Sequence, residues 1–171
     1  AGRTAQEYNL RKKRKGAFWE DRYHATAIQS EEHLMRCLVY LDLNMVRTGK
    51  VSHPSEWPFC GYNEIQSPRR KTVLISYQKL ASLAGFTSYD VFKRAHKKLV
   101  ESALSTGRRE RQSMWTESIA VGSGSYVNTI KEKLGFRAKG RKVIEHSGVC
   151  ELREKCVGYV THFNAEMNNF E

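Results

Sequence analysis

The sequence predicts an α+β fold, in which a short strand-bearing part is followed by a mainly helical part. Residues 17–28 are rich in aromatic and β-branched side chains with partial alternation, which is typical of a strand. Residues 30–48 carry apolar side chains at helical spacing, and most of the second half has the same period. Residues 65–71 hold a proline and three basic residues, which indicates a linker. We therefore expect one domain over residues 1–66 and a helical extension over residues 72–171.

The net charge indicates the kind of partner. Lys and Arg number 29 against 18 Asp and Glu, which leaves a formal charge of +11. A surface with this excess attracts polyanions, and nucleic acid is the commonest of these. The sequence has no apolar run of about 18 residues that could span a membrane, and it shows no secretory signal. Together with four scattered cysteines, these features predict a nucleic-acid-binding protein of the reducing cytoplasm.

The densest basic cluster lies near the start of the chain. It consists of Arg11, Lys12, Lys13, Arg14 and Lys15, followed by Gly16. Adjacent cations repel one another, so a run of this kind is usually a solvated loop. It is either a plain polar loop or the tip of a hairpin that contacts phosphates.

The helix expected over residues 30–48 carries the strongest candidate for chemistry. Ser30 supplies a hydroxyl cap, acidic residues follow in the first turn, and Gly49 supplies the stop. Apolar side chains cover most of its circumference, so we expect it to be deeply packed. A polar stripe interrupts this surface at positions i, i+4, i+8 and i+11, namely Arg36, Tyr40, Asn44 and Arg47.

A polar stripe on a buried helix needs partners, and a functional site is one way of providing them. A tyrosine hydroxyl such as that of Tyr40 can attack a phosphodiester when cations and a metal stabilise the developing charge. The amide oxygen of Asn44 is a suitable hard ligand for Mg²⁺ or Mn²⁺. The structural alternatives are a core tyrosine and an amide that hydrogen-bonds to a neighbouring loop.

The extension begins with a helix-turn-helix pattern. Helices expected over residues 77–84 and 88–104 flank a glycine turn, and the second helix is basic. Arg94 and Lys97 are its candidate DNA contacts, and a plain helical hairpin is the alternative.

Two further helices are expected over residues 125–134 and 149–164, with a basic turn between them. Two histidines and two cysteines near the end of the chain also allow a zinc site, namely His146, Cys150, Cys156 and His162. Buried thiols are the alternative.

Three blocks of the sequence, taken together, resemble one known family. They are residues 16–23 (GAFWEDRY), residues 40–47 with 49–51 (YLDLNMVR and GKV), and residues 54–62 (PSEWPFCGY). Their order and spacing closely resemble those of the REP-associated tyrosine transposases, single-tyrosine members of the HUH superfamily, over residues 5–65. The resemblance implies a small antiparallel sheet with helices on its faces, of which residues 1–66 would form the C-terminal portion of the catalytic domain.

The activity that the resemblance implies is metal-dependent DNA transposition. Such an enzyme is a single-strand endonuclease that cleaves and rejoins hairpin-flanked single-stranded DNA through a 5′-phosphotyrosine intermediate. By matched position Tyr40 is the nucleophile, Asn44 faces the Mg²⁺ or Mn²⁺, and Arg22 and the basic loop before it contact DNA. Arg36 and Arg47 on the polar stripe are further expected DNA contacts.

The sequence departs from the family pattern in two ways. Met45 replaces the usual proline after the asparagine, and no two of the six histidines have the His-x-His spacing of the family's metal motif. Because the chain opens with Ala1 and residues 1–9 resemble the tail of a helix, we expect it to begin partway through a longer protein. The alternative is a non-catalytic protein, derived from such a transposase, that binds DNA hairpins. Either protein is expected at the bacterial nucleoid, as a monomer or a homodimer.

Overall fold

The computed structural model describes residues 2–14, 25–69, 71, 75–107 and 110–153. The helices and strands are, in chain order, α1 (Gly2–Arg11), β1 (Ala27–Ile28), α2 (Glu32–Asp42), α3 (Asn44–Arg47), η1 (Pro54–Glu56), α4 (Gly61–Gln66), α5 (Tyr77–Leu83), α6 (Tyr89–Ser105), α7 (Met114–Glu117), β2 (Ser118–Gly122), α8 (Gly124–Leu134), η2 (Gly135–Ala138), β3 (Lys142–His146) and β4 (Val149–Arg153). The fold is mixed α+β, as the sequence predicts, with one small four-stranded sheet. Across the described part of the chain, no helix is long and apolar enough to cross a membrane.

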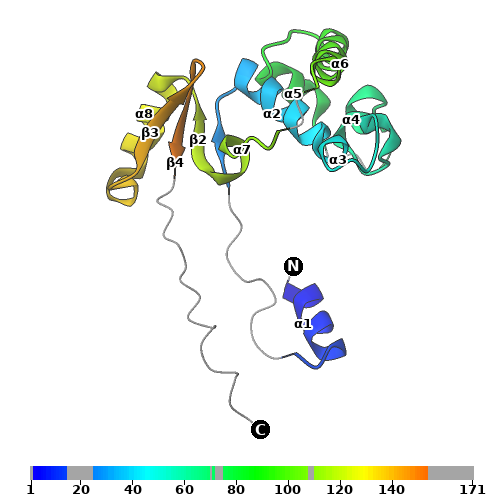
Figure 1. Ribbon diagram of the computed structural model, residues 1–171, viewed down its shortest axis with the longest axis horizontal. Coiled ribbons are helices and arrows are strands. Elements are labelled where there is room, and N and C mark those ends of the chain that lie inside the picture. The colour runs from blue at the N-terminus through cyan, green and yellow to red at the C-terminus, as the bar shows by residue number, and fades with distance from the viewer. Residues whose placement is uncertain (1, 15–24, 70, 72–74, 108–109, 154–171) are drawn as a thin grey trace.

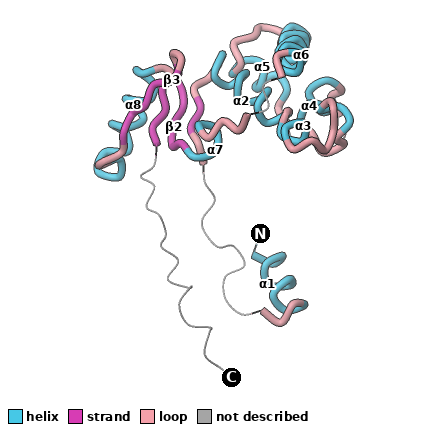
Figure 2. Tube along the Cα trace, viewed as in Figure 1, coloured by secondary structure: helices cyan, strands magenta, loops and turns pink. Residues whose placement is uncertain are grey.

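The elements form two parts of unlike architecture (Figure 1). Helices α2 to α6 make up a helical part, the four-stranded sheet together with α8 makes up the other, and α7 lies between them. Figure 2 shows the strands gathered in one part and the other part built of helices and loops. Helix α1 stands apart from both, and none of its residues is buried.

The predicted tyrosine-bearing helix is two helices. Helix α2 gives way to α3 at Leu43, whose φ of −78° and ψ of 3° interrupt the helical backbone. The predicted cap is wrong, because Glu31 rather than Ser30 precedes the first helical residue and its side chain makes no capping hydrogen bond. The Glu31 backbone N–H donates to the carbonyl oxygen of Leu83 at 2.7 Å. A contact with α5 thus accompanies the start of this helix in place of a local cap.

Helices α5 and α6 have the helix-turn-helix proportions that the sequence predicts. Gly85 lies between them with φ 83°, a conformation that glycine adopts without strain. Their shared core contains Phe92 and extends to Met35 of α2 and Ile65 of α4. Packing therefore crosses the boundary predicted at residues 66–72, and Ile65, only 2% exposed, belongs to this core rather than to a linker.

The sheet has the strand order β1-β2-β4-β3. The short β1 pairs with β2 in parallel, with Ala27 opposite Ala120, whereas β2, β4 and β3 are antiparallel. Helix α8 packs Val127 against Ala120 and Leu152, which are all fully buried. Of the strand predicted over residues 17–28, residues 27–28 form β1 and residues 17–24 lie outside the described residues.

The prediction of a mainly helical extension is wrong at three segments, which are the strands β2 (118–122), β3 (142–146) and β4 (149–153). The start of the helix predicted over 149–164 is strand β4, and residues beyond 153 lie outside the described part. The physical reason is a hairpin at Ser147 and Gly148, whose φ values of 50° and 78° match the two-residue loop that connects antiparallel strands. This turn places Val149 opposite His146 and starts the return strand.

The same hairpin changes the geometry on which the predicted zinc site was based. His146 and Cys150 lie on paired strands and not one helical turn apart. Cys156 and His162 lie outside the described residues. Within the described residues, no three His, Cys, Asp or Glu side chains gather in a way that could hold a metal ion.

Truncating a core side chain of β4 tests the sheet. Leu152 is fully buried between β2 and α8, so Leu152→Ala should lower the free energy of unfolding by about 2–5 kcal/mol. Leu99→Ala is the matched control, since Leu99 is 44% exposed on α6 and its truncation should cost less than about 1 kcal/mol. Urea denaturation measures both, and equal losses would contradict the packing of β4.

Candidate functional site

Three of the four residues of the predicted polar stripe are in contact. The Arg47 guanidinium donates from Nη1 to the Tyr40 carbonyl oxygen at 2.7 Å and from Nη2 to Asn44 Oδ1 at 3.2 Å. Its Cζ atom also lies 3.8 Å from the centroid of the Tyr40 ring, within the range of a cation–π contact. Arg36 differs, because it pairs with Glu32 at 3.5 Å on the solvent-facing side of α2. The site is therefore the cluster of Tyr40, Asn44 and Arg47.

The Tyr40 side chain lies at the seam between the helical part and the sheet. It is 9% exposed and shares a core with Cys37, Trp115 and Val121, and its ring centroid is 6.4 Å from that of Trp115. Within the described residues its hydroxyl has no hydrogen-bond partner. The ring is thus held in an apolar setting.

This arrangement has the elements of an anion-binding nucleophile. A guanidinium held against a tyrosine can stabilise the negative charge that builds on a phosphate during attack. A phenol is among the side chains that form covalent intermediates. Arg47 is also fixed by two hydrogen bonds, so its charge is already in place before a substrate arrives.

The residues around Asn44 do not fit a divalent metal. Its side-chain oxygen already accepts a hydrogen bond from Arg47, and the guanidinium, at 3.2 Å, would repel a second cation. The one carboxylate between residues 33 and 53, that of Asp42, is turned inward and is 5% exposed. We therefore derive no chemical step through a metal at Asn44.

The remaining predicted DNA contacts lie on two separate elements. Arg11, Lys12, Lys13 and Arg14 are exposed at the end of α1, which stands apart from Tyr40 (Figure 1). Lys15 and Arg22 lie outside the described residues. Arg94 and Lys97 are exposed on α6, in the same helical part as α2. The structure thus brings the stripe together but does not bring the α1 cluster to it.

A buried polar contact that the sequence analysis missed joins α2 to α6. Asp42 Oδ2 lies 3.0 Å from His96 Nε2, although the two atoms do not meet hydrogen-bond geometry, and the side chains are 6% and 0% exposed. The Gln66 amide nitrogen lies 3.2 Å from the Lys93 carbonyl oxygen and 3.3 Å from His96 Nδ1. Because an amide nitrogen only donates, Nδ1 must accept, which leaves the imidazole proton on Nε2 beside the carboxylate.

Helix α4 completes this cluster through Cys60, which precedes its first residue. The thiol donates toward Asp42 Oδ1 at 3.4 Å. The pKa of Cys60 is raised to about 11, chiefly by burial; a backbone hydrogen bond at Tyr62 lowers it, and the charge of Asp42 and its hydrogen bond with the thiol raise it. The burial of His96 could have been predicted from the sequence, since it lies four residues from both Phe92 and Val100 on the apolar face of α6.

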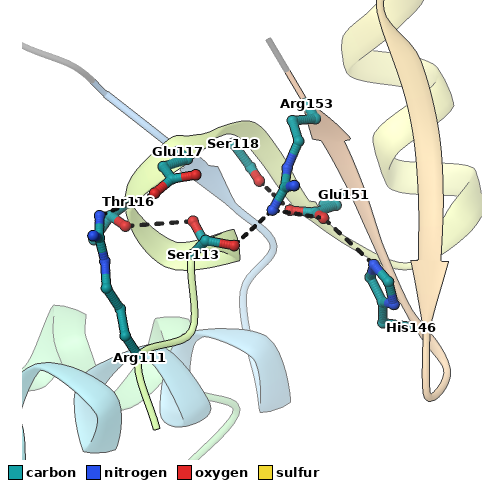
Figure 3. Close-up of polar contacts among 8 residues, drawn as sticks. All are labelled: Arg111, Ser113, Thr116, Glu117, Ser118, His146, Glu151 and Arg153. Carbon is teal, nitrogen blue, oxygen red and sulfur yellow. Dashed lines mark hydrogen bonds and ion pairs between the residues drawn. The ribbon is translucent and has the colours of Figure 1, made fainter. Parts of the chain in front are cut away.

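A second buried carboxylate, that of Glu151, lies in β4 of the sheet (Figure 3). Glu151 is 1% exposed, accepts a hydrogen bond from the Ser118 hydroxyl, and lies 3.5 Å from Arg153 and 3.8 Å from His146. Arg153 also donates to the Ser113 hydroxyl at 2.6 Å, just before α7.

The arrangement of these side chains is not that of a serine hydrolase. The Ser118 hydroxyl donates directly to the Glu151 carboxylate, whereas in a catalytic triad an imidazole lies between serine and carboxylate. Through Ser113 the cluster holds α7, the helix that presents Trp115 to Tyr40.

Comparisons of the chain with protein-family models, with curated proteins and with solved structures find no match. What these observations define is a mixed α+β protein with a tyrosine–arginine cluster at the seam of its two parts.

Removing Asp42 should weaken the helical part. Asp42→Ala leaves the Cys60 thiol without its acceptor and removes the carboxylate that lies 3.0 Å from His96 Nε2, so we expect a loss of about 1–3 kcal/mol in the free energy of unfolding. Glu117→Ala is the control, because it removes an exposed pair with Arg111 and should cost less than about 1 kcal/mol. Denaturant unfolding compares them, and an unchanged stability of Asp42→Ala would exclude a structural role for the contact.

The raised pKa of Cys60 predicts slow alkylation. At about pH 8 the folded thiol is almost wholly protonated, so iodoacetamide should modify Cys60 on the order of a hundredfold more slowly than in the denatured chain. The rate should rise as the pH approaches the pKa of about 11, because the thiolate is the reactive form. Peptide mass spectrometry follows the site, and rapid native alkylation near neutral pH would contradict the burial.

Proposed function

We propose that this chain is the nucleophile-bearing part of a DNA strand transferase that cleaves and rejoins single-stranded DNA beside a hairpin. The observation that carries the proposal is the contact of the Tyr40 ring with the fixed Arg47 guanidinium, whose Cζ atom lies 3.8 Å from the ring centroid. The resemblance of residues 5–65 to the REP-associated tyrosine transposases supports the same role for Tyr40.

The proposed step is an in-line displacement at phosphorus. The Tyr40 oxygen attacks the phosphodiester, a bond from that oxygen to phosphorus forms, and the bond from phosphorus to the 3′ oxygen breaks. The tyrosine proton passes to solvent, and the leaving 3′ oxygen takes up a proton to become a free 3′-OH. The 5′-phosphotyrosine link conserves the phosphodiester energy, so a second 3′-OH can attack it and reform DNA.

The DNA in this proposal is held by basic side chains on α6 and on the end of α1. Arg94 and Lys97 are exposed on α6 and can neutralise phosphates, as can Arg11 to Arg14 on α1. Mg²⁺ or Mn²⁺ belongs to the proposal through the family resemblance alone. A role in DNA cleavage places the protein at the bacterial nucleoid.

A second candidate function is binding of DNA hairpins without cleavage. It is favoured by the engagement of Arg47, whose guanidinium covers the Tyr40 ring and occupies the Asn44 oxygen. In this alternative the cluster of Tyr40, Asn44 and Arg47 stabilises the junction of α2 and α3, and the basic side chains alone hold DNA.

A covalent adduct separates the two functions. With a His-x-His strand supplied upstream in the same polypeptide, the protein should form an adduct with labelled hairpin-bearing single-stranded DNA in the presence of Mg²⁺ or Mn²⁺, and the adduct should survive a denaturing gel. Tyr40→Phe should reduce this adduct by roughly a thousandfold or more, because the variant has no nucleophile, while DNA binding stays near that of the unmodified chain.

Tyr62→Phe is the matched control, since Tyr62 is a buried tyrosine in a different core, and it should form the adduct normally. Binding without any adduct, with both metal ions and several hairpins, would contradict cleavage and leave the hairpin-binding alternative.

A further inference from the structure

A second basic surface surrounds the turn that follows α8. Residues 131–142 hold six Lys or Arg and one acidic residue. In their midst Phe136 is 84% exposed, although a large aromatic side chain is normally buried. Neither feature has a part in the Tyr40 cluster.

The local backbone explains why Phe136 points outward. Helix α8 ends at Leu134, and the φ of 51° at the next residue, Gly135, turns the chain out of the helix. The next residues form η2, in which Ala138 is 3% exposed and fixes the turn against the protein. With Ala138 inward, Phe136 is left on the outer side of the turn, and no space-filling role remains for it.

An open hollow of about 570 Å³ lies beside this ring. Its walls include Asn128, Lys131 and Lys139 together with Phe136. The Lys139 ammonium is 5.5 Å from the centroid of the Phe136 ring, so an aromatic face and a positive charge meet at one place. The volume lies within the range of small-ligand sites, which suits a nucleobase.

We propose that this turn is a binding site for a single-stranded polynucleotide, separate from the Tyr40 cluster. One base stacks on the Phe136 ring, and the phosphates on either side of it contact Lys139 and Arg137. Stacking on an exposed aromatic ring flanked by cations is the general means of binding single strands without sequence preference. The Asn128 amide and the Glu132 carboxylate, both on the wall of the hollow, can accept hydrogen bonds from the base edge.

The helix dipole accounts for only part of this surface. Lys131 and Lys133 lie in the last turn of α8, where cations are favoured without any ligand. Arg137 and Lys139 lie beyond the helix, are exposed, and have no such explanation. The dipole gives no reason for an exposed phenylalanine.

A membrane surface is a poorer occupant than a nucleic acid. Exposed aromatic and basic residues also occur on membrane-binding helices, but these bury a broad apolar face. Here Phe136 is the one large apolar side chain between residues 100 and 153 of the described chain that is exposed. A single ring can stack on a base, whereas it offers little area for insertion.

This inference goes beyond the proposed function and does not depend on it. In Figure 1 the end of α8 and helices α3 to α6 lie at opposite ends of the molecule, so the turn adds a contact distinct from Arg94 and Lys97. It requires neither a hairpin nor cleavage, and this allows the two proposals to be tested apart.

The test is fluorescence anisotropy with a labelled strand of about 20 thymidines, and with its uridine equivalent, neither of which forms a hairpin. Phe136→Ala should weaken binding about tenfold by loss of one stacked base, and Phe136→Trp should restore it. Lys139→Ala should lower the slope of log affinity against log salt by about 0.7, because one phosphate contact is lost.

Phe59→Ala is the matched control. Phe59 is 86% exposed, a fraction close to the 84% of Phe136. Residues 51–68 contain no Lys or Arg, so its truncation should leave the affinity unchanged. Circular dichroism checks that each variant is folded, and both rings are exposed enough for truncation to leave the core intact.

Several results would overturn the inference. The first is that the unmodified chain does not bind the strands. The second is that Phe136→Ala binds with the affinity of the unmodified chain. The third is that Phe136→Ala and Phe59→Ala lose the same amount of affinity. A fourth is binding to phosphatidylserine vesicles that needs Phe136 while strand binding does not, which would assign the turn to a membrane. A preference for the thymidine or the uridine strand identifies the polynucleotide. If Phe136→Ala loses strand binding while the unmodified chain forms no Tyr40 adduct, this site is supported. Strand transfer is then contradicted, and the two proposals are distinguished.

Discussion

The burial of the Asp42 carboxylate is the constraint on which the helical part depends. A carboxylate that is 5% exposed is costly unless other groups replace its water, and here those groups come from α4 and α6. Their contacts restrict how α2 can sit against α6. Tyr40 lies two residues earlier, about 200° around the helix. The contact that holds Asp42 inward therefore also sets the direction in which Tyr40 faces.

The sheet applies a second constraint from the opposite side. Glu151 is buried in β4, and its neighbour Arg153 donates to Ser113 at the start of α7. This hydrogen bond positions Trp115 against the Tyr40 ring. The packing of Tyr40 thus depends on residues from both parts of the molecule.

The excess of positive charge is unevenly distributed over the chain. It is dense on α1, on α6 and at the turn after α8, whereas residues 51–68 contain no Lys or Arg. A polyanion would therefore meet separate basic surfaces instead of a uniform field, and its affinity should fall steeply with salt. At the turn after α8 an aromatic ring accompanies the charge, which favours an unpaired base over a duplex. On α6 the exposed side chains are cations on a regular helix, which suits contacts with phosphates.

The sequence by itself determined the local features. Helices α5, α6 and α8 lie within one residue of their predicted ends, because helical periodicity and a glycine stop are properties of adjacent residues. The stripe that joins Tyr40 to Arg47 could be predicted for the same reason. The tertiary structure alone decided the sheet and the buried polar contacts. Residues 149–152 are all buried and show no alternation, so their strand depends on β2 and β3 on either side, and His96 needs a partner distant in sequence. Such pairings depend on which distant segments meet, and neither spacing nor composition carries that information.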